Sequence, residues 1–125
     1  MSIELITHEK GEVMIVDVSG RLTLGEGTSA LRKRMRELVE GGSRQIVLNM
    51  TDVTYMDSSG LGELVAAYTT VTTTGGELKL SNLARRVHEL LFITKLCTVF
   101  ESFEDEASAI ASFSVAKPTE LQAQI

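Results

Sequence analysis

Apolar residues along this chain follow two periods, one of about two residues and one of three to four residues. Short β-branched runs, such as the QIVLNM segment at residues 45–50, predict strands. Apolar positions at helical spacing, such as the series that starts at Leu61, predict one face of a helix. The predicted strands are residues 3–7, 13–18, 45–50, 77–80 and 99–103. The predicted helices run from residue 28 or 29 to about residue 40, from residues 57–59 into a threonine-rich segment at 69–74, over residues 85–94, and from residue 105 through residue 113.

The order of these elements predicts an α/β fold in a single domain. Residues 8–12 form a polar connection with a glycine and predict a β-hairpin, after which helices and strands alternate. This order implies a mixed sheet with helices packed against it. Gly41-Gly42 is expected to end the first helix, and the threonines at residues 69–74 are expected to fray the last turn of the central helix. The residues expected on buried helix faces are Leu31, Met35, Leu38, Val39, Val87, Leu90, Leu91, Ala107, Ile110 and Ala111, with Ile93 as a further candidate.

Composition and charge narrow the class of protein to a cytoplasmic domain. The net charge of −5 argues against nucleic-acid binding, which needs a basic surface, and no apolar run approaches the roughly 20 residues of a membrane span. The single Cys97 cannot form an internal disulfide, which fits a reducing compartment. We expect its side chain to be a small residue of the core. Residues 114–125 turn polar and are expected to form a mobile tail.

The strongest chemical signal lies in residues 55–62 (YMDSSGLG), where a predicted strand is followed by a helix. Asp57 and the two serines after it favour a helix N-cap, because their side-chain oxygens accept from the free N–H groups of the first turn. A helix N-terminus also tolerates an anion. Gly60 and Gly62 remove side chains beside the serines, so another backbone can approach closely. An exposed hydroxyl at this place can either cap the helix or be chemically modified.

Other kinds of site find little support in the sequence. A serine hydrolase needs a base near its nucleophile, and the only histidines are His8, in the predicted hairpin, and His88, in a predicted helix. The sequence has no phosphate-binding glycine motif, zinc-ligand spacing or calcium-loop pattern, so we expect no cofactor, no metal and no catalysis. An esterase-like enzyme stays open as an alternative. The basic residues Arg32-Lys33-Arg34 and Arg36 are expected to form a solvated face, with a contact surface for an acidic partner as the alternative.

Residues 56–62 (MDSSGLG) resemble the signature of the STAS domain, particularly that of bacterial anti-sigma factor antagonists. The resemblance covers about residues 3–113. Gly20-Arg21-Leu22 matches the family's Gly-x-Leu after the second strand, and residues 94–103 resemble its last-strand region. The resemblance implies a four- or five-stranded mixed β-sheet with about four α-helices, in agreement with the order predicted from periodicity.

In that family the serine directly after the aspartate is phosphorylated by a partner anti-sigma factor, itself an ATP-dependent serine kinase. By position this serine is Ser58, with Ser59 as its neighbour. The resemblance implies that the unmodified protein binds the kinase and frees a sigma factor, that phosphorylation releases it, and that a PP2C-type phosphatase restores it. The partner-binding residues expected are Thr23, Asp57, Ser58, Ser59, Gly60, Leu61 and Gly62.

Thr23 is a departure from the family pattern, which usually has an aspartate at this position. Because threonine is neutral and can donate to a phosphate, we expect altered rates of phosphorylation or dephosphorylation at Ser58. The alternative function is a STAS scaffold or sensor subunit that binds another partner or a small ligand. The sequence leaves the oligomeric state open.

Overall fold

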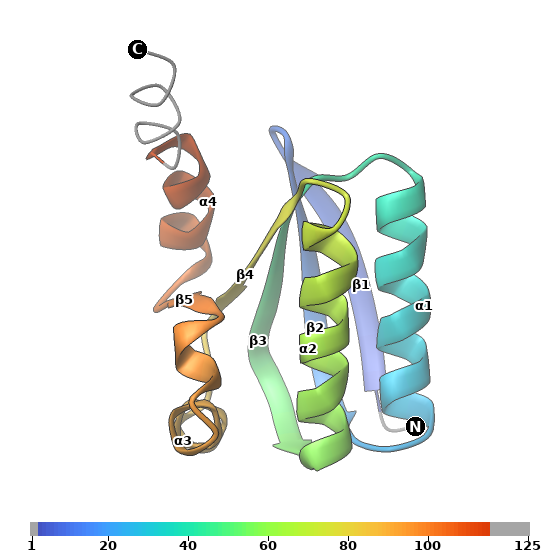
Figure 1. The fold of residues 1–125 in the computed structure, drawn as a ribbon, viewed down its shortest axis with the longest axis vertical. Coiled ribbons are helices and arrows are strands. Elements are labelled where there is room, and N and C mark those ends of the chain that lie inside the picture. Colours follow the sequence, from blue (N-terminus) through green and yellow to red (C-terminus); the bar gives the residue numbers. More distant parts are fainter. Residues whose placement is uncertain (1–2, 116–125) are drawn as a thin grey trace.

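The computed structural model describes residues 3–115 of the chain and shows one mixed sheet with helices packed on both faces (Figure 1). The strands are β1 (Ile3–Lys10), β2 (Val13–Leu22), β3 (Gln45–Met56), β4 (Glu77–Ser81) and β5 (Glu101–Phe103). The helices are α1 (Glu26–Glu40), α2 (Ser58–Thr72), α3 (Arg85–Ile93) and α4 (Glu106–Val115), and a 3₁₀ turn, η1 (Leu96–Thr98), precedes β5. Within the described part of the chain, this arrangement confirms the predicted α/β fold.

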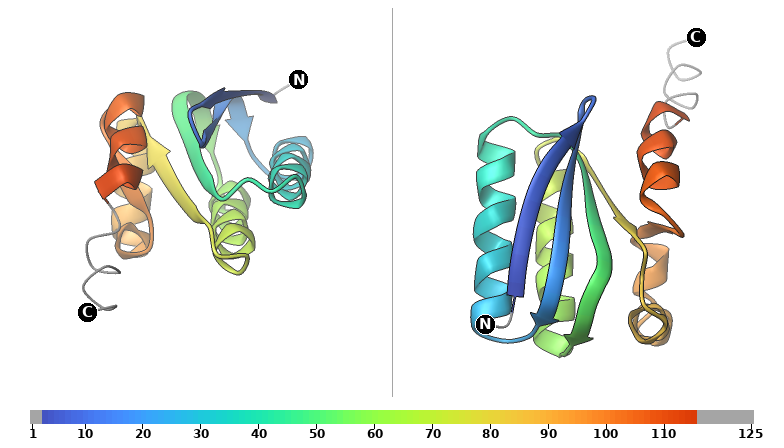
Figure 2. Two further views of the ribbon diagram at one scale, coloured as in Figure 1. Left: turned by 90° about the horizontal axis from the view of Figure 1, so that it is seen from above. Right: turned by 180° about the vertical axis from the view of Figure 1, so that it is seen from behind.

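The connections between strands place the helices. The sheet order is β1-β2-β3-β4-β5, with β1 antiparallel to β2 and all other neighbours parallel. Right-handed crossovers that always step in the same direction along a sheet put their helices on one face. α1 and α2 accordingly stand side by side on one face (Figure 1, Figure 2). α4 follows the last strand, crosses over nothing, and packs on the other face.

Two apolar clusters fill the two faces of the sheet. The larger cluster lies under the crossover helices and includes Leu48 of β3 and Leu64 of α2, both fully buried. The smaller cluster joins Val47 of β3 to Ala109 and Phe113 of α4. Because the central strands are covered on both faces, they carry near-continuous apolar runs instead of strict alternation.

The strands extend further than their apolar runs predicted. The expected connection at residues 8–12 shrinks to a tight turn at Gly11, which has φ of 65°, so the predicted hairpin is confirmed but its loop is shorter. β2 continues to Leu22 through register irregularities near Gly20, and β3 continues to Met56. Polar residues extend these strands because neighbouring backbones still pair, whatever their side chains.

The first helix begins earlier than predicted. α1 starts at Glu26 and not after Thr28 or Ser29, because Gly25 takes up φ of 104° and acts as N-cap. The Thr28 hydroxyl instead accepts from the Gly25 N–H at 3.3 Å. At the other end, Gly42 has φ of 100°, which confirms that the glycine pair ends this helix.

The threonine-rich end of α2 stays helical through Thr72, so the expected early fraying is wrong. The hydroxyls there donate to carbonyls one turn earlier, as Thr69 does to Val65 at 3.1 Å and Thr72 does to Tyr68 at 2.8 Å. Val71 is fully buried and anchors this last turn in the core. Tertiary packing therefore outweighs the low helix propensity of threonine.

In the C-terminal third, α3 buries Val87 and Leu91 as predicted, but Ile93 is 74% exposed and therefore does not belong to the core. Cys97 lies in the 3₁₀ turn and is exposed, so its assignment to the core is wrong. Local apolar neighbours predicted burial for both residues, whereas the direction in which the chain turns after α3 leaves them at the surface.

Helix α4 is rotated relative to the predicted face. Asp105 caps it as expected, accepting from the N–H three residues on at 2.7 Å. Ala109 and Phe113 are the buried residues, whereas Ala107 and Ala111, which we expected to face inward, are exposed. The segment predicted as a tail begins inside this helix, and beyond Val115 it lies outside the described residues.

Candidate functional site

The candidate site lies at the carboxyl ends of β2 and β3. These strands are parallel neighbours, and their last residues, Leu22 and Met56, are paired in register. The loop from β2 to α1 and the start of α2 therefore meet at one edge of the sheet (Figure 1). This is the edge at which open α/β sheets commonly bind their ligands.

Asp57 organises the site because its two carboxylate oxygens hold two different segments. Oδ1 accepts from the Gly60 N–H at 2.8 Å and caps α2. Oδ2 accepts from the Leu24 N–H at 3.2 Å and ties down the β2–α1 loop. The hydrogen bond from Gly60 is the main reason that the pKa of Asp57 lies below its usual value. The predicted strand-to-helix transition at Asp57 is confirmed.

The two serines differ in exposure. Ser58 is the first residue of α2 and is exposed, whereas Ser59 is half-buried. Because Asp57 provides the cap, the Ser58 hydroxyl is not required to satisfy the helix terminus. Of the two, Ser58 is the more accessible side chain.

The two glycines after the serines have different surroundings. A Cβ at Gly60 would overlap the backbone carbonyl oxygen of Leu22 and lie 2.9 Å from Cγ of Met56. Gly60 is buried, so the close approach that it permits is internal, between α2 and the end of β2, and not with a partner as we expected. Leu61 is also buried, with 8% exposure, whereas Gly62 is exposed with nothing near its Cα hydrogens.

The β2–α1 loop adds residues that sequence reasoning missed. Leu24 is 76% exposed and sits directly on the loop held by Asp57. Thr23, the predicted partner residue before it, is half-buried, and its carbonyl accepts from the Thr28 N–H at 3.1 Å. On β3, Tyr55 is 38% exposed and carries the guanidinium of Arg21 4.9 Å from its ring centre. The sequence held one signal for an exposed Leu24: this apolar residue lies next to a glycine-containing loop and belongs to neither a helical nor a strand pattern.

Two arginines on the basic side of α1 form hydrogen bonds or ion pairs with neighbouring elements. Arg32 pairs with the buried carboxylate of Glu63 on α2 at 2.9 Å, and this hydrogen bond raises the pKa of Arg32. Arg34 donates to the Thr7 hydroxyl at 2.5 Å. Arg32, Lys33 and Arg36 are exposed, as expected for a solvated face, although Arg32 also pairs with Glu63, whereas Arg34 is half-buried.

The histidines considered as catalytic bases have other surroundings. His8 lies on β1, hydrogen-bonded to Asp17 of β2 at 3.1 Å, and His88 lies on α3. Among residues 3–115, neither histidine contacts Ser58 through a hydrogen bond that would activate it as a nucleophile. The arrangement thus presents an accessible hydroxyl on a well-ordered helix start.

Comparison with known proteins gives consistent results. The family model described as the STAS domain matches residues 4–109. The chain is 30% identical over 109 residues to the anti-sigma F factor antagonist of Paenibacillus polymyxa. That match covers 86% of this chain and 92% of the relative. The chain is 32% identical over 101 residues to the anti-sigma-B factor antagonist of Bacillus subtilis (strain 168), covering 81% and 91%.

Among solved structures, the Bacillus cell fate determinant SpoIIAA in its phosphorylated form superposes with a TM-score of 0.69. That match covers 90% of this chain and 99% of SpoIIAA at 18% identity, and so it shows a shared fold. None of the helices within residues 3–115 has the length and apolar character needed to cross a membrane.

Proposed function

Because this chain belongs to the STAS domain family, we propose that it is an anti-sigma factor antagonist controlled by phosphorylation of Ser58. Unmodified, it binds an anti-sigma factor serine kinase and frees a sigma factor; phosphorylated, it dissociates, and a PP2C-type phosphatase restores it. The observation that carries the proposal is the exposed Ser58 hydroxyl beside the capping carboxylate of Asp57. The names of the two relatives support the general function. Because the kinase consumes ATP, we place the switch in the cytoplasm. In this proposal the protein itself is not an enzyme.

A phosphate on Ser58 acts by adding charge at the contact surface. The phosphate group adds about −1.5 to −2 elementary charges at neutral pH. The N-terminus of α2 stabilises such an anion by at most about 2 kcal/mol, and the neighbouring carboxylate of Asp57 repels it. A partner packed on the loop buries this charge without a counter-ion, which is costly. A difference of about 5.5 kcal/mol in partner binding changes a complex from almost fully bound to almost fully released.

The surface around Ser58 suits a protein partner. Leu24 offers an exposed apolar side chain, Tyr55 a partly exposed ring, and Gly62 a helix surface with no side chain. All three lie near the carboxyl ends of β2 and β3, on segments that Asp57 and the sheet hold in place. A rigid patch with an apolar anchor beside a modifiable hydroxyl permits tight binding that one phosphate can abolish.

The first test identifies the acceptor. The chain is incubated with ATP and candidate anti-sigma factor kinases, and the products are mapped by phosphopeptide mass spectrometry. Wild type and Ser59→Ala should gain one phosphate, and Ser58→Ala should gain none. Phosphate on Ser59, or unchanged incorporation in Ser58→Ala, contradicts the assignment.

The second test measures partner binding by calorimetry with the same kinase. Ser58→Asp should weaken binding at least tenfold while leaving the urea unfolding midpoint unchanged. Leu24→Ser should also weaken binding at least tenfold, because the apolar anchor is lost. Ile6→Ser, which removes another exposed apolar residue on the edge strand β1, serves as the matched control and should bind like wild type. Equal affinity of Ser58→Asp and wild type refutes the electrostatic block.

The departure at Thr23 predicts a kinetic difference. Thr23→Asp places a carboxylate on the β2–α1 loop, next to the segment bound by Asp57. We expect changed rates of phosphorylation or dephosphorylation with little change in stability, measured with purified kinase and phosphatase. Rates equal to those of wild type contradict this expectation.

A further inference from the structure

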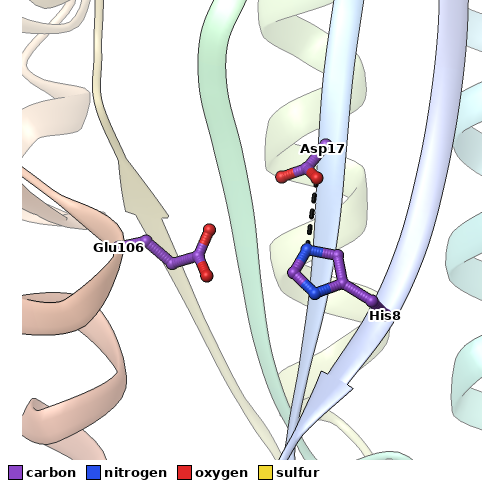
Figure 3. A group of neighbouring side chains, drawn as sticks. All are labelled: His8, Asp17 and Glu106. Carbon is purple, nitrogen blue, oxygen red and sulfur yellow. Dashed lines mark hydrogen bonds and ion pairs between the residues drawn. The ribbon is translucent and has the colours of Figure 1, made fainter.

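We propose that His8, Asp17 and Glu106 bind a first-row divalent transition-metal ion such as Zn²⁺, away from the Ser58 loop. The three residues come from β1, β2 and the first turn of α4 and converge on the sheet face that carries α4 (Figure 3). One potential ligand atom from each residue lies within 4.8 Å of the other two. All three side chains are half-buried, so they are partly shielded from water but open to an entering ion.

One of the three pairs of ligand atoms, now joined by a hydrogen bond, is already spaced almost as in a bound site. His8 Nε2 and Asp17 Oδ2 are 3.1 Å apart. Ligand atoms held about 2.0–2.2 Å from a tetrahedral zinc lie about 3.4 Å from one another. The Glu106 carboxylate extends from α4 toward the other two side chains (Figure 3) and has the rotatable bonds needed to close the remaining gap.

Asn49 orients the two carboxylates of the proposed site. Its amide oxygen accepts from the Thr51 N–H at 3.0 Å and from the Thr51 hydroxyl at 2.6 Å, which fixes the amide orientation. The amide nitrogen therefore faces the carboxylates, donating to Asp17 Oδ1 at 3.0 Å and to Glu106 Oε1 at 3.3 Å. One oxygen of each carboxylate is thereby oriented, and the second oxygen of each faces a nitrogen: Asp17 Oδ2 lies 3.1 Å from His8 Nε2, and Glu106 Oε2 lies 3.0 Å from the Lys10 ammonium. Hydrogen bonds of this kind hold the carboxylates of protein metal sites.

Lys10 shows that the second oxygens already attract positive charge. Its ammonium lies 3.0 Å from Glu106 Oε2, and its side chain is 54% exposed. A metal ion must displace this ammonium from Glu106, so Lys10 is a competitor for the site. An alternative without metal is a simple ion-pair network that ties α4 to the hairpin. The two readings differ for a Lys10 variant, which should bind a metal more tightly only if the carboxylate is a ligand.

The ligand set selects the class of ion. One imidazole nitrogen with two carboxylate oxygens suits zinc and its neighbours, whereas Mg²⁺ and Ca²⁺ prefer sites made only of oxygen. A bound ion would link the β1–β2 hairpin directly to α4, the helix that comes after the short strand β5 in the chain. A bound ion should therefore stabilise the attachment of α4 to the sheet.

The test uses the full chain without a histidine tag, stripped with a chelator, and titrated with Zn²⁺ in competition with a chromophoric chelator. Wild type should bind one ion per chain. His8→Ala and Glu106→Gln should each weaken binding by about tenfold or more. Lys10→Gln should strengthen it. His88→Ala removes the other histidine and should bind like wild type.

Circular dichroism and urea midpoints confirm that each variant is folded, and His8 and Glu106 give two independent ligand variants. Mg²⁺ should raise the unfolding temperature less than Zn²⁺ does. Zinc affinity that is unchanged in His8→Ala, unchanged in Lys10→Gln, or equally reduced in His88→Ala overturns the proposal. None of these outcomes bears on the Ser58 switch, which involves other residues.

Discussion

Gly60→Ala should destabilise the protein even though alanine is the better helix former. Residue 60 lies in the first turn of α2, where the helix rests against the end of β2. The added methyl group would overlap the Leu22 carbonyl oxygen and lie 2.9 Å from Cγ of Met56. The methionine side chain can rotate, but the carbonyl belongs to the backbone of β2, which is paired with β3 at this residue, so α2 itself must move.

The size of the effect follows from two opposing contributions. Overpacking a well-filled site costs about 1–3 kcal/mol, and a clash with backbone belongs at the upper end of this range. Replacing glycine in a helix by alanine contributes about 1 kcal/mol of stability in the opposite direction. We therefore expect Gly60→Ala to lower the free energy of unfolding by about 2 kcal/mol. Gly62→Ala, at an exposed position two residues further along α2, meets nothing within 4 Å and should raise it by up to about 1 kcal/mol.

Urea denaturation followed by circular dichroism measures both variants. With a slope of about 1.5 kcal/mol per molar urea, the midpoint should fall by about 1.3 M for Gly60→Ala and rise by up to about 0.7 M for Gly62→Ala. The opposite signs are the decisive result, because helix propensity alone predicts the same sign for both. If Gly60→Ala is as stable as wild type, the close packing of α2 on Leu22 is refuted.

Three further predictions concern charges and the thiol. Because the pKa of Asp57 is lowered in the folded state, its contribution to stability is present above the unfolded pKa near 4 and is lost as the pH falls through the lower, folded value. The difference in urea midpoint between wild type and Asp57→Asn should therefore shrink below about pH 4. A difference that stays constant with pH contradicts this prediction. Arg32→Ala leaves the buried carboxylate of Glu63 without its ion pair and should lower the urea midpoint at pH 7 more than Arg36→Ala, an exposed position on the same helix; equal losses would show that the pair adds nothing. The exposed Cys97 should react fully with Ellman's reagent in the folded protein, whereas reaction only in urea would restore it to the core.

The candidate site was predictable as far as local chemistry reaches. Asp57 caps α2 and Ser58 begins it, as the order of an acidic residue and two serines before a helical period predicted. The contact between Asp57 and Leu24 was not predictable, because the two residues are 33 positions apart and meet only through the parallel pairing of β2 with β3. The same pairing turns Gly60 inward, although the sequence presents it as an equal of Gly62.

By itself, the sequence determined the alternation of strands and helices, the first β-hairpin and the helix start at Asp57, because each depends on hydrogen bonds and side chains within a few residues of one another. Only the tertiary structure decided which side of α4 is buried and which strand ends meet. Those outcomes depend on how the sheet is ordered, and short-range periodicity does not encode that order. Ser58 is therefore recognisable in the sequence, whereas its surroundings and the grouping of His8 with Glu106 exist only in the folded protein.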